Sequence, residues 1–465
     1  MFFTSQDELI QNIKGTASLA NGGVKIEDPD RLRTHAIDTL VKNSVLNDSN
    51  EIRGLSRFII KSAALEMGII PSSIQELYEA RGRGECNGFT VPAINIRGMS
   101  YDFSRSIFRA AHKLNTGSFI FEIAKSEIGY TYQQPHELVP VVLGAAIREC
   151  HTGPVFIQGD HFQVNANNFA NNREKELSEL KNLIRLGIEA GFYNIDIDTS
   201  TLVNLKQPTV IEQQRANFEV GVELTKYIRE LEPEGVTISI GGEIGEVGKE
   251  NSNENELRAY MDNFNECLDK ALRGAKTISK ISIQTGTSHG GVPGPDGQVV
   301  QVNLDFDCLE NLSKISRQDY GLAGAVQHGA STLPRGLFNK FPQLETAEIH
   351  LATDFQNMIF DHERFPNDLR EEIYAHLRKN FSSEKKDTDT DKQFIYKTRK
   401  KGFGEFKSKF WDISDDIRLE IGKQLESKVE YLFTQLKVHN TIAIAEKTIK
   451  PVKVFPDLAR EIAAA

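Results

Sequence analysis

The sequence predicts an α/β protein built on a (β/α)8 TIM barrel, with a helical extension at each end of the chain. Two observations predict this fold. From about residue 88, eight short apolar segments rich in β-branched residues alternate with segments of amphipathic helical pattern. Acids and histidines, which can act in catalysis or bind metal, also follow most of these segments. The C-terminal strand ends of such a barrel form its active site. An open doubly wound sheet is the alternative, and it would require a reversal of strand order.

The predicted strands and helices alternate along the middle of the chain. The eight strands are predicted at 89–96, 118–124, 154–160, 193–198, 236–242, 280–286, 322–328 and 347–353. Helices between them are predicted at 103–115, 174–191 and 255–275. Strands that alternate with helices favour a parallel sheet.

The chain divides into three predicted parts. Residues 1–75 form an N-terminal helical extension, which includes a helical pattern at 51–68 and carries no chemical motif. Residues 76–380 form the barrel with its metal site, and residues 381–465 form a charged loop followed by a C-terminal helical segment. A basic run at 397–409 in the last part is interpreted as solvated surface, with phosphate binding as the alternative.

Composition limits the class of function. The 465 residues carry a net charge of −10, which argues against general binding of nucleic acid. No apolar run approaches the roughly 18 residues of a membrane span, and the N-terminus has no secretion-signal pattern. The four cysteines are scattered without a CxxC pair, so a thiolate metal site is not expected. We expect a cytoplasmic protein without a nucleic-acid or membrane partner.

Histidines and acids stand where the predicted strands end. The third strand ends in Asp160 and His161, and the fourth ends in Asp198. His289 and His328 follow the sixth and seventh strands. A single histidine is more often structural, but strand ends converge on one barrel mouth, and three imidazoles with a carboxylate suit a catalytic zinc ion. Other first-row divalent ions accept the same ligands.

Glycines flank two of these histidines, in "SHGGVPGPDG" and "QHGAS". Glycine lets backbone amides approach a ligand closely. Ser331 and Thr332 after "HGA" can cap a helix, and a capped helix N-terminus also favours anions. The segment is therefore predicted to serve as a cap, a phosphate cradle or both.

Six motifs in order resemble one known family. They are "FTVPAINIRG", "PVFIQGDHF", "DIDTS", "GEIGEVG", "GTSHGG" and "QHGAS". Their order and spacing are similar to those of the class II metal-dependent ketose-bisphosphate aldolases, such as fructose-bisphosphate aldolase. The resemblance runs from about residue 70 to the segment at 410–418.

The resemblance implies a lyase and a role for each matching residue. The implied metal ligands are His161, Glu246, His289 and His328. Asp160 is implied as the acid or base at the C4 oxygen, and Glu254 as the residue that moves the carbon-bound proton, with Glu250 and Glu256 as rivals. The implied substrate-binding residues are Asp198, Gly290, Gly329, Ser331, Thr353 and Arg418.

The same resemblance implies the cofactor, substrate and assembly. It implies Zn2+, with another first-row divalent metal as the alternative, and allows a monovalent cation in addition. It implies a sugar phosphate substrate, most simply fructose 1,6-bisphosphate in glycolysis and gluconeogenesis, and a homodimer or higher homo-oligomer.

Three positions depart from the family pattern and leave alternatives open. His350 and Ala352 stand where the family usually has Asn and Asp, and Ala330 replaces the middle glycine of His-Gly-Gly-Ser. A different substrate such as tagatose 1,6-bisphosphate, or a non-catalytic partner subunit, are therefore alternatives. A Schiff-base aldolase is a further alternative. Lys125, just after the second strand, is the only plausible lysine for that Schiff base, because Lys276 and Lys280 lie just before or at the start of the sixth strand, away from the active-site end.

Overall fold

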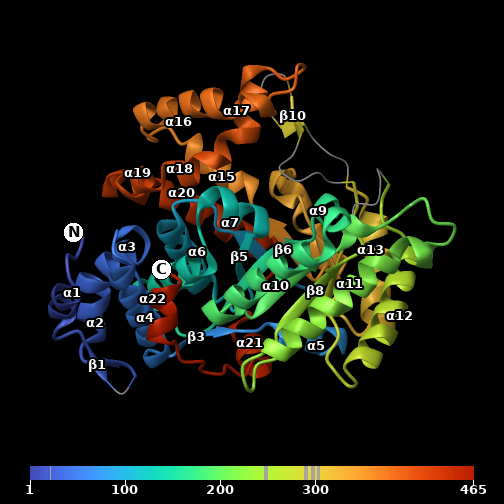
Figure 1. The fold of residues 1–465 in the computed structure, drawn as a ribbon, viewed down its shortest axis with the longest axis horizontal. Helices are drawn as coiled ribbons and strands as arrows, with labels where there is room; N and C mark the ends of the chain where they lie inside the picture. Colours follow the sequence, from blue (N-terminus) through green and yellow to red (C-terminus); the bar gives the residue numbers. More distant parts are fainter. Residues whose placement is uncertain (21, 246–249, 287–291, 295–298, 301–303) are drawn as a thin grey trace.

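A computed structural model describes the chain except residues 21, 246–249, 287–291, 295–298 and 301–303. Its centre is a closed parallel barrel, with the strand order β4-β5-β6-β7-β8-β9-β12-β13 and a return to β4 (Figure 1). These strands are β4 Val91–Asn95, β5 Ile120–Ala124, β6 Gly153–Gln163, β7 Asn194–Asp198, β8 Ser239–Glu243, β9 Lys280–Ile283, β12 Ala325–Gln327 and β13 Glu348–Leu351. The predicted barrel is confirmed, and each predicted strand overlaps one of these eight.

Burial explains why these segments become strands. Every residue of β4, β5, β7 and β13 is buried, as expected for parallel strands covered by helices on one face and packed inside a barrel on the other. β6 is longer than the rest because its first half also pairs with an added strand, β3 Ile69–Ser72, outside the barrel. Its second half pairs with β7, which closes the barrel. The sequence analysis did not predict β3.

Helices cover the outside of the barrel (Figure 1). They include α6 Ser100–Leu114, α7 Lys125–Thr131, α8 Pro135–Arg148, α9 Ala166–Asn171, α10 Arg173–Ala190, α11 Val210–Leu231, α12 Glu254–Ala271, α13 Phe306–Tyr320, α14 Lys340–Gln343 and α15 Thr353–Phe360. The three helices predicted between strands correspond to α6, α10 and α12. Shorter elements between them are η2 Ser200–Leu202, β10 Val292–Pro293, β11 Val299–Val300, η3 Ala330–Thr332 and η4 Arg335–Leu337.

The N-terminal extension packs on the barrel's own helices. It contains α1 Gln6–Ile13, β1 Ala17–Ala20, β2 Gly23–Ile26, α2 Pro29–Arg31, η1 Leu32–Ala36, α3 Ile37–Leu46, α4 Asn50–Glu66 and, after β3, α5 Gln75–Gly82. Both α3 and α4 contact α8. Lys61 of α4 pairs with Glu461 at 2.5 Å, and His136 of α8 lies 3.2 Å from the same carboxylate. This buried cluster joins both ends of the chain to the barrel.

The C-terminal part is helical and crosses one side of the barrel. It contains α16 Asn367–Asn380, η5 Ser382–Glu384, α17 Asp391–Thr398, η6 Arg399–Lys401, α18 Gly402–Glu405, α19 Lys407–Trp411, α20 Asp415–Gln435, α21 Ile442–Thr448 and α22 Leu458–Ala463. α20 lies in the predicted C-terminal helical segment, and it packs along α6. In Figure 1 the α16–α19 segment lies above α7 and α15. The basic run at 397–409 thus folds into short helices, and its Phe403 and Phe406 are buried.

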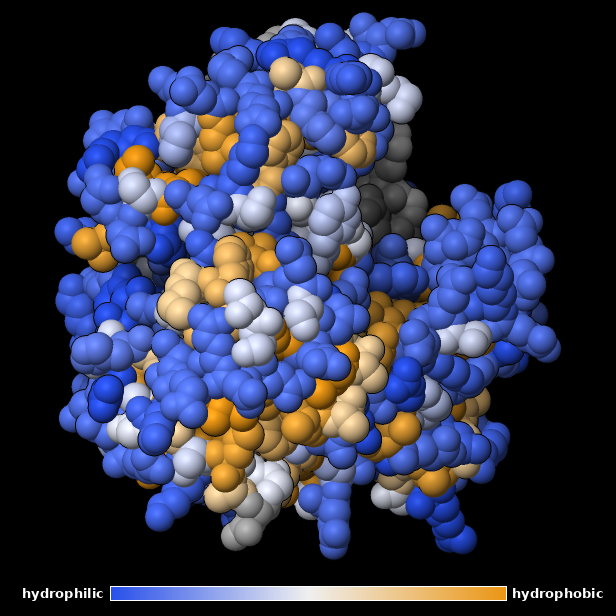
Figure 2. All heavy atoms as spheres, turned by 60° about the vertical axis from the view of Figure 1, so that its left-hand side comes forward, coloured by the Kyte–Doolittle hydropathy of each residue, from blue (hydrophilic) through white to orange (hydrophobic). Residues whose placement is uncertain are grey.

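The outer surface is mainly polar. Hydrophilic side chains cover most of the face in Figure 2, and hydrophobic ones gather in its lower half. Apolar side chains on a protein surface are normal in this amount, since polar atoms alone do not cover it. In the part of the chain that the structure describes, no helix is both long enough and apolar enough to cross a membrane.

The barrel interior contains a sealed group of charged and polar side chains, here called the interior charge layer: Tyr78, Gln158, Asp196, Lys280 and Glu348. The Lys280 ammonium lies 3.0 Å from Asp196 and 2.5 Å from Glu348, and it donates to Gln158 at 2.8 Å. Tyr78 donates to Glu348. Burial alone would lower the pKa of Lys280, but the two carboxylates raise it. The buried charge of Lys280 is therefore balanced by the carboxylates of Asp196 and Glu348.

Candidate metal and active site

The end of β6 delivers two neighbouring side chains to the barrel mouth. Adjacent residues of a regular strand point to opposite faces. Here the pairing with β7 shifts register between Gly159 and Phe162, and His161 has a left-handed φ of 40°. Such a bulge re-aims a side chain at the cost of local strain, so Asp160 and His161 both face the cavity. Gly159 has no room for a side chain, because a Cβ there would lie 2.5 Å from the Phe162 ring.

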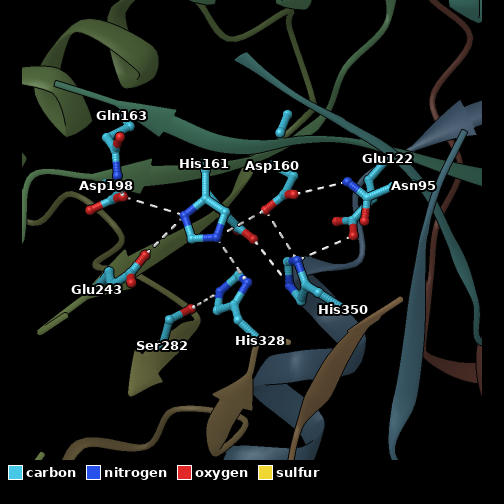
Figure 3. A network of polar contacts seen from close by, with 12 residues as sticks. Asn95, Glu122, Asp160, His161, Gln163, Asp198, Glu243, Ser282, His328 and His350 are labelled. Atoms are coloured by element: carbon cyan, nitrogen blue, oxygen red, sulfur yellow. Dashed lines mark hydrogen bonds and ion pairs between the residues drawn. The ribbon is translucent and has the colours of Figure 1, made fainter. Parts of the chain in front are cut away.

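His161 stands at the centre of a cluster of side chains from the ends of β6, β7, β8, β9 and β12 (Figure 3). Its Nδ1 lies 3.3 Å from Asp198 Oδ2 at the end of β7 and 3.2 Å from Glu243 Oε2 at the end of β8. Its Nε2 lies 3.0 Å from Nδ1 of His328, which follows β12. Nε2 of His328 lies 3.0 Å from the Ser282 hydroxyl. The structure therefore brings together three residues that the sequence singled out: His161, Asp198 and His328.

Glu243 is the carboxylate that the sequence analysis did not assign. The expected ligand, Glu246, lies outside the described residues, as does His289. Burial, and then the charge of Asp198, raise the pKa of Glu243 from 4.5 to about 7. Both glutamates belong to the segment "GGEIGEVG", and the family resemblance implied Glu246 of the two. The signal that favours Glu243 is its place as the last residue of β8.

Asp160 is held by two donors. Asn95 of β4 donates to its Oδ2 at 3.0 Å, and Nδ1 of His350 lies 3.1 Å from its Oδ1. Burial alone would raise the pKa of Asp160, but the charges of His161 and His350 keep it well below its usual range. Asp160 is thus a fixed and ionised carboxylate beside the histidine cluster.

His350 links this site to the interior charge layer. Its Nδ1 also lies 3.2 Å from Glu122 of β5, and its Nε2 lies 2.8 Å from Glu348. His350 was expected from the sequence only as a departure from the family pattern. Its position in β13, beside two acids, explains why a basic ring is accepted there.

A cavity of about 480 Å³ opens at this end of the barrel. Of the predicted site residues, Asp160, His161, His328, Gly329, Ser331 and Thr353 line it. Asp198 is buried behind His161, and Gly290 lies outside the described residues. Lining residues that the sequence analysis did not predict include Asn95, Arg97, Tyr130 and Lys400, and Lys125 was named only for the Schiff-base alternative.

Two further predicted site residues, Arg418 and Glu254, lie away from the cavity. Arg418 in α20 pairs with Asp102 at 3.1 Å and with Asp415 at 2.5 Å. Glu254 is the first residue of α12, is exposed and pairs with Arg258 at 2.8 Å. The side chain of its rival Glu256 accepts from the backbone of Asn253 as part of a helix cap. The structure therefore does not bring these groups to the candidate site.

The donor atoms at the mouth fit a divalent metal ion. Those of Asp160, His161 and His328 lie within 4.8 Å of one another, and so do those of His161, Asp198 and Glu243. Two imidazoles and several buried carboxylates are typical ligands of first-row divalent ions. Burial and the charge of Asp198 raise the pKa of Glu243, and a cation bound there would offset that negative charge.

The sequence profile of the class II fructose-bisphosphate aldolases matches residues 76–409. The chain belongs to this family. The predicted enzyme class, a lyase of the class II aldolase type, is confirmed by this membership, and members of this aldolase family are generally metal-dependent. No protein of curated function matches the chain in sequence.

Solved structures match the chain at low sequence identity. A fructose-bisphosphate aldolase from Campylobacter jejuni is 16% identical, with 80% of this chain and 97% of that chain covered and a TM-score of 0.48. A protein from Sinorhizobium meliloti named as a probable tagatose 6 phosphate kinase is 14% identical, with 81% and 97% covered and a TM-score of 0.50. The second likeness supports the barrel fold of this aldolase family member.

Proposed function

We propose that the chain is a divalent-metal-dependent aldolase that cleaves a ketose bisphosphate, with fructose 1,6-bisphosphate as the first candidate. The products would be dihydroxyacetone phosphate and glyceraldehyde 3-phosphate. One observation carries the proposal: an ionised carboxylate, Asp160, stands next to a His161–His328–Glu243 cluster at the mouth of a barrel whose sequence matches the family.

His161, His328 and Glu243 would hold the metal, with His289 and Glu246 as further predicted ligands. When bound, a divalent cation supplies positive charge beside the substrate's carbonyl and hydroxyl oxygens, where negative charge develops. We propose zinc, because imidazoles and a carboxylate suit it. Asp198 accepts from His161 and would fix the orientation of this ligand, as second partners of metal-bound histidines commonly do.

Asp160 would take the proton from the C4 hydroxyl in cleavage and return it in condensation. Its lowered pKa keeps it ionised, ready to accept a proton. Asn95 and His350 hold its two oxygens, so its direction is set before substrate binds. The carbon-bound proton is assigned to one of Glu250, Glu254 and Glu256, and glutamine variants of each distinguish them by their turnover.

The remaining residues concern the substrate and the assembly. Gly329, Ser331 and Thr353 line the cavity and are proposed to bind the phosphate of the dihydroxyacetone half. Arg418 is proposed to bind the second phosphate of the sugar, which requires its ion pairs with Asp102 and Asp415 to break. A homodimer, a cytoplasmic location and a role in glycolysis and gluconeogenesis are proposed from the family resemblance. A monovalent cation is proposed as an addition at the phosphate.

One experiment tests the proposal. Cleavage of fructose 1,6-bisphosphate and of tagatose 1,6-bisphosphate is measured before chelation, after chelation and after zinc is restored. We expect activity that is lost with the metal and returns with it, and the ratio of the two rates identifies the sugar. Chelator-resistant activity that borohydride traps would instead point to a Schiff base on Lys125, which lines the cavity and donates to the Gln163 carbonyl at 2.8 Å. Bound metal with no activity on either sugar would favour a non-catalytic partner subunit.

A further inference from the structure

One wall of the cavity carries two cations and a phenol that the motifs do not explain. Arg97 follows β4, Tyr130 is in α7, and Lys400 is in η6. η6 belongs to residues 361–414, between α15 and α20, here called the insertion. Arg97 Nη1 donates to Thr353 Oγ1 at 3.3 Å and to Gln356 at 2.9 Å. This wall therefore adjoins the residue proposed to bind phosphate.

Close packing fixes the segment that carries Lys400. α18, which follows it, contacts α7. A Cβ on Gly98 would lie 2.1 Å from the Phe403 ring, and one on Gly404 would lie 2.4 Å from the Tyr130 carbonyl oxygen. Arg399, beside Lys400, pairs with Asp361 at 2.5 Å. Glycines at these two contacts allow the insertion to dock against the cavity wall.

The two cations differ in how they are partnered. Arg97 pairs with Glu127 at 2.5 Å, so one positive charge is matched. In the described part of the chain, the Lys400 side chain has no hydrogen bond or carboxylate partner, and its ammonium lies 5.3 Å from the centre of the Tyr130 ring. Burial, and then the charge of Arg97, lower the pKa of Lys400. An anion beside it would relieve this unfavourable environment.

Tyr130 adds an unused donor. Its hydroxyl is buried and has no hydrogen-bond partner among the described residues. A buried polar group without a partner costs about 1–3 kcal/mol, which a ligand oxygen would recover. Arg97, which is paired with a carboxylate, Lys400, which is not, and Tyr130, whose hydroxyl has no partner, thus line one cavity.

We propose that Arg97, Tyr130 and Lys400 form an anion subsite for a phosphoryl group of the sugar, adjoining Thr353. This inference rests on the proposed function for the sugar, while the subsite itself requires only an anion. Arginine and lysine are the residues that bind phosphate oxygens most strongly, and a tyrosine hydroxyl donates to a third. The insertion then acts in substrate binding, because it supplies Lys400 within the same chain.

The test uses inorganic phosphate and the full-length metal-loaded protein. Calorimetry measures phosphate affinity for the parent, Lys400→Met, Tyr130→Phe and the matched control Lys401→Met. Lys401 is the next residue, pairs with Glu384 and does not line the cavity. We expect phosphate to bind Lys400→Met about tenfold or more weakly and Tyr130→Phe about threefold more weakly, by the loss of charged and neutral hydrogen bonds. Lys401→Met should match the parent, and Lys400→Arg should recover part of the affinity.

A second readout separates this inference from the proposed function. If the protein cleaves a ketose bisphosphate, Lys400→Met should raise KM about tenfold with its metal content unchanged. If it cleaves none, a selective loss of phosphate affinity in Lys400→Met still supports the subsite while the proposed function fails. Equal phosphate affinity in Lys400→Met and Lys401→Met would overturn the subsite, whether or not the protein is an aldolase.

Discussion

The barrel contains two charged regions that differ in how their charges are matched. In the interior charge layer, Lys280 is enclosed by Asp196 and Glu348 and has no exposed atom to offer a ligand. At the mouth, Asp160, Asp198 and Glu243 all contact the single imidazole of His161. His350 contacts both regions. The comparison teaches that buried charge alone does not mark a site, whereas unmatched charge beside a cavity does.

Replacement of Lys280, the cation of the interior charge layer, should have the largest effect on stability. Lys280→Met would leave Asp196 and Glu348 buried without their partner. We expect the free energy of unfolding to fall by about 3–5 kcal/mol, as when one member of a buried ion pair is removed. Urea denaturation followed by circular dichroism measures it.

The matched control for this change is Lys276→Met. Lys276 lies four residues earlier, and its 59% exposed side chain pairs with Glu79. Exposed pairs contribute about 0–1 kcal/mol. A loss in Lys280→Met no larger than that in Lys276→Met would show that the interior charge layer is not held by matched partners.

The stability of the metal-free protein should depend on pH through Glu243 at the mouth of the barrel. Glu243 has its pKa raised from 4.5 to about 7 in the folded state. Between these values the folded chain holds a proton that the unfolded chain has lost, so metal-free stability should fall as pH rises through this window. The loss should be about 3 kcal/mol for this one group, and Glu243→Gln should remove it.

Urea unfolding of the chelated protein between about pH 5 and about pH 8 measures this slope. Glu179→Gln, an exposed change on α10, serves as the control. Added zinc should flatten the parent's slope, because a bound cation favours the ionised carboxylate. If the slope of stability against pH were unchanged in Glu243→Gln, Glu243 would not be the group that causes this pH dependence.

A smaller effect on the free energy of unfolding is expected from Tyr78→Phe in the interior charge layer. The change deletes one donor to Glu348 but leaves Lys280, Gln158 and His350 in contact with it. We expect a loss of about 2 kcal/mol, the usual range for a hydrogen bond to a charged group. Thermal unfolding with aldolase turnover in parallel would show whether the loss is confined to stability. A loss of turnover at full folding would mean that the sealed region takes part in the chemistry.

Strand positions and strand ends could be predicted from the sequence because both depend on local pattern. Alternating apolar segments placed all eight barrel strands, and polar residues at their ends identified Asp160, His161 and His328. Three-dimensional packing decided the rest. Lys400 is remote from the motifs along the chain and reaches the cavity only because Gly98 and Gly404 let its segment dock. The pairing of Arg418 with Asp102, 316 residues away, likewise has no local signal.

The central claim is that two neighbours at the end of β6 have different tasks: His161 holds a metal and Asp160 moves a proton. Metal content and turnover of His161→Ala and Asp160→Ala test it most directly. His161→Ala should lose both the metal and the activity. Asp160→Ala should bind metal as the parent does and lose turnover by about 10²–10⁴-fold, the range for removal of a general acid or base. Turnover in Asp160→Ala equal to the parent's, or full metal content in His161→Ala, would contradict the account.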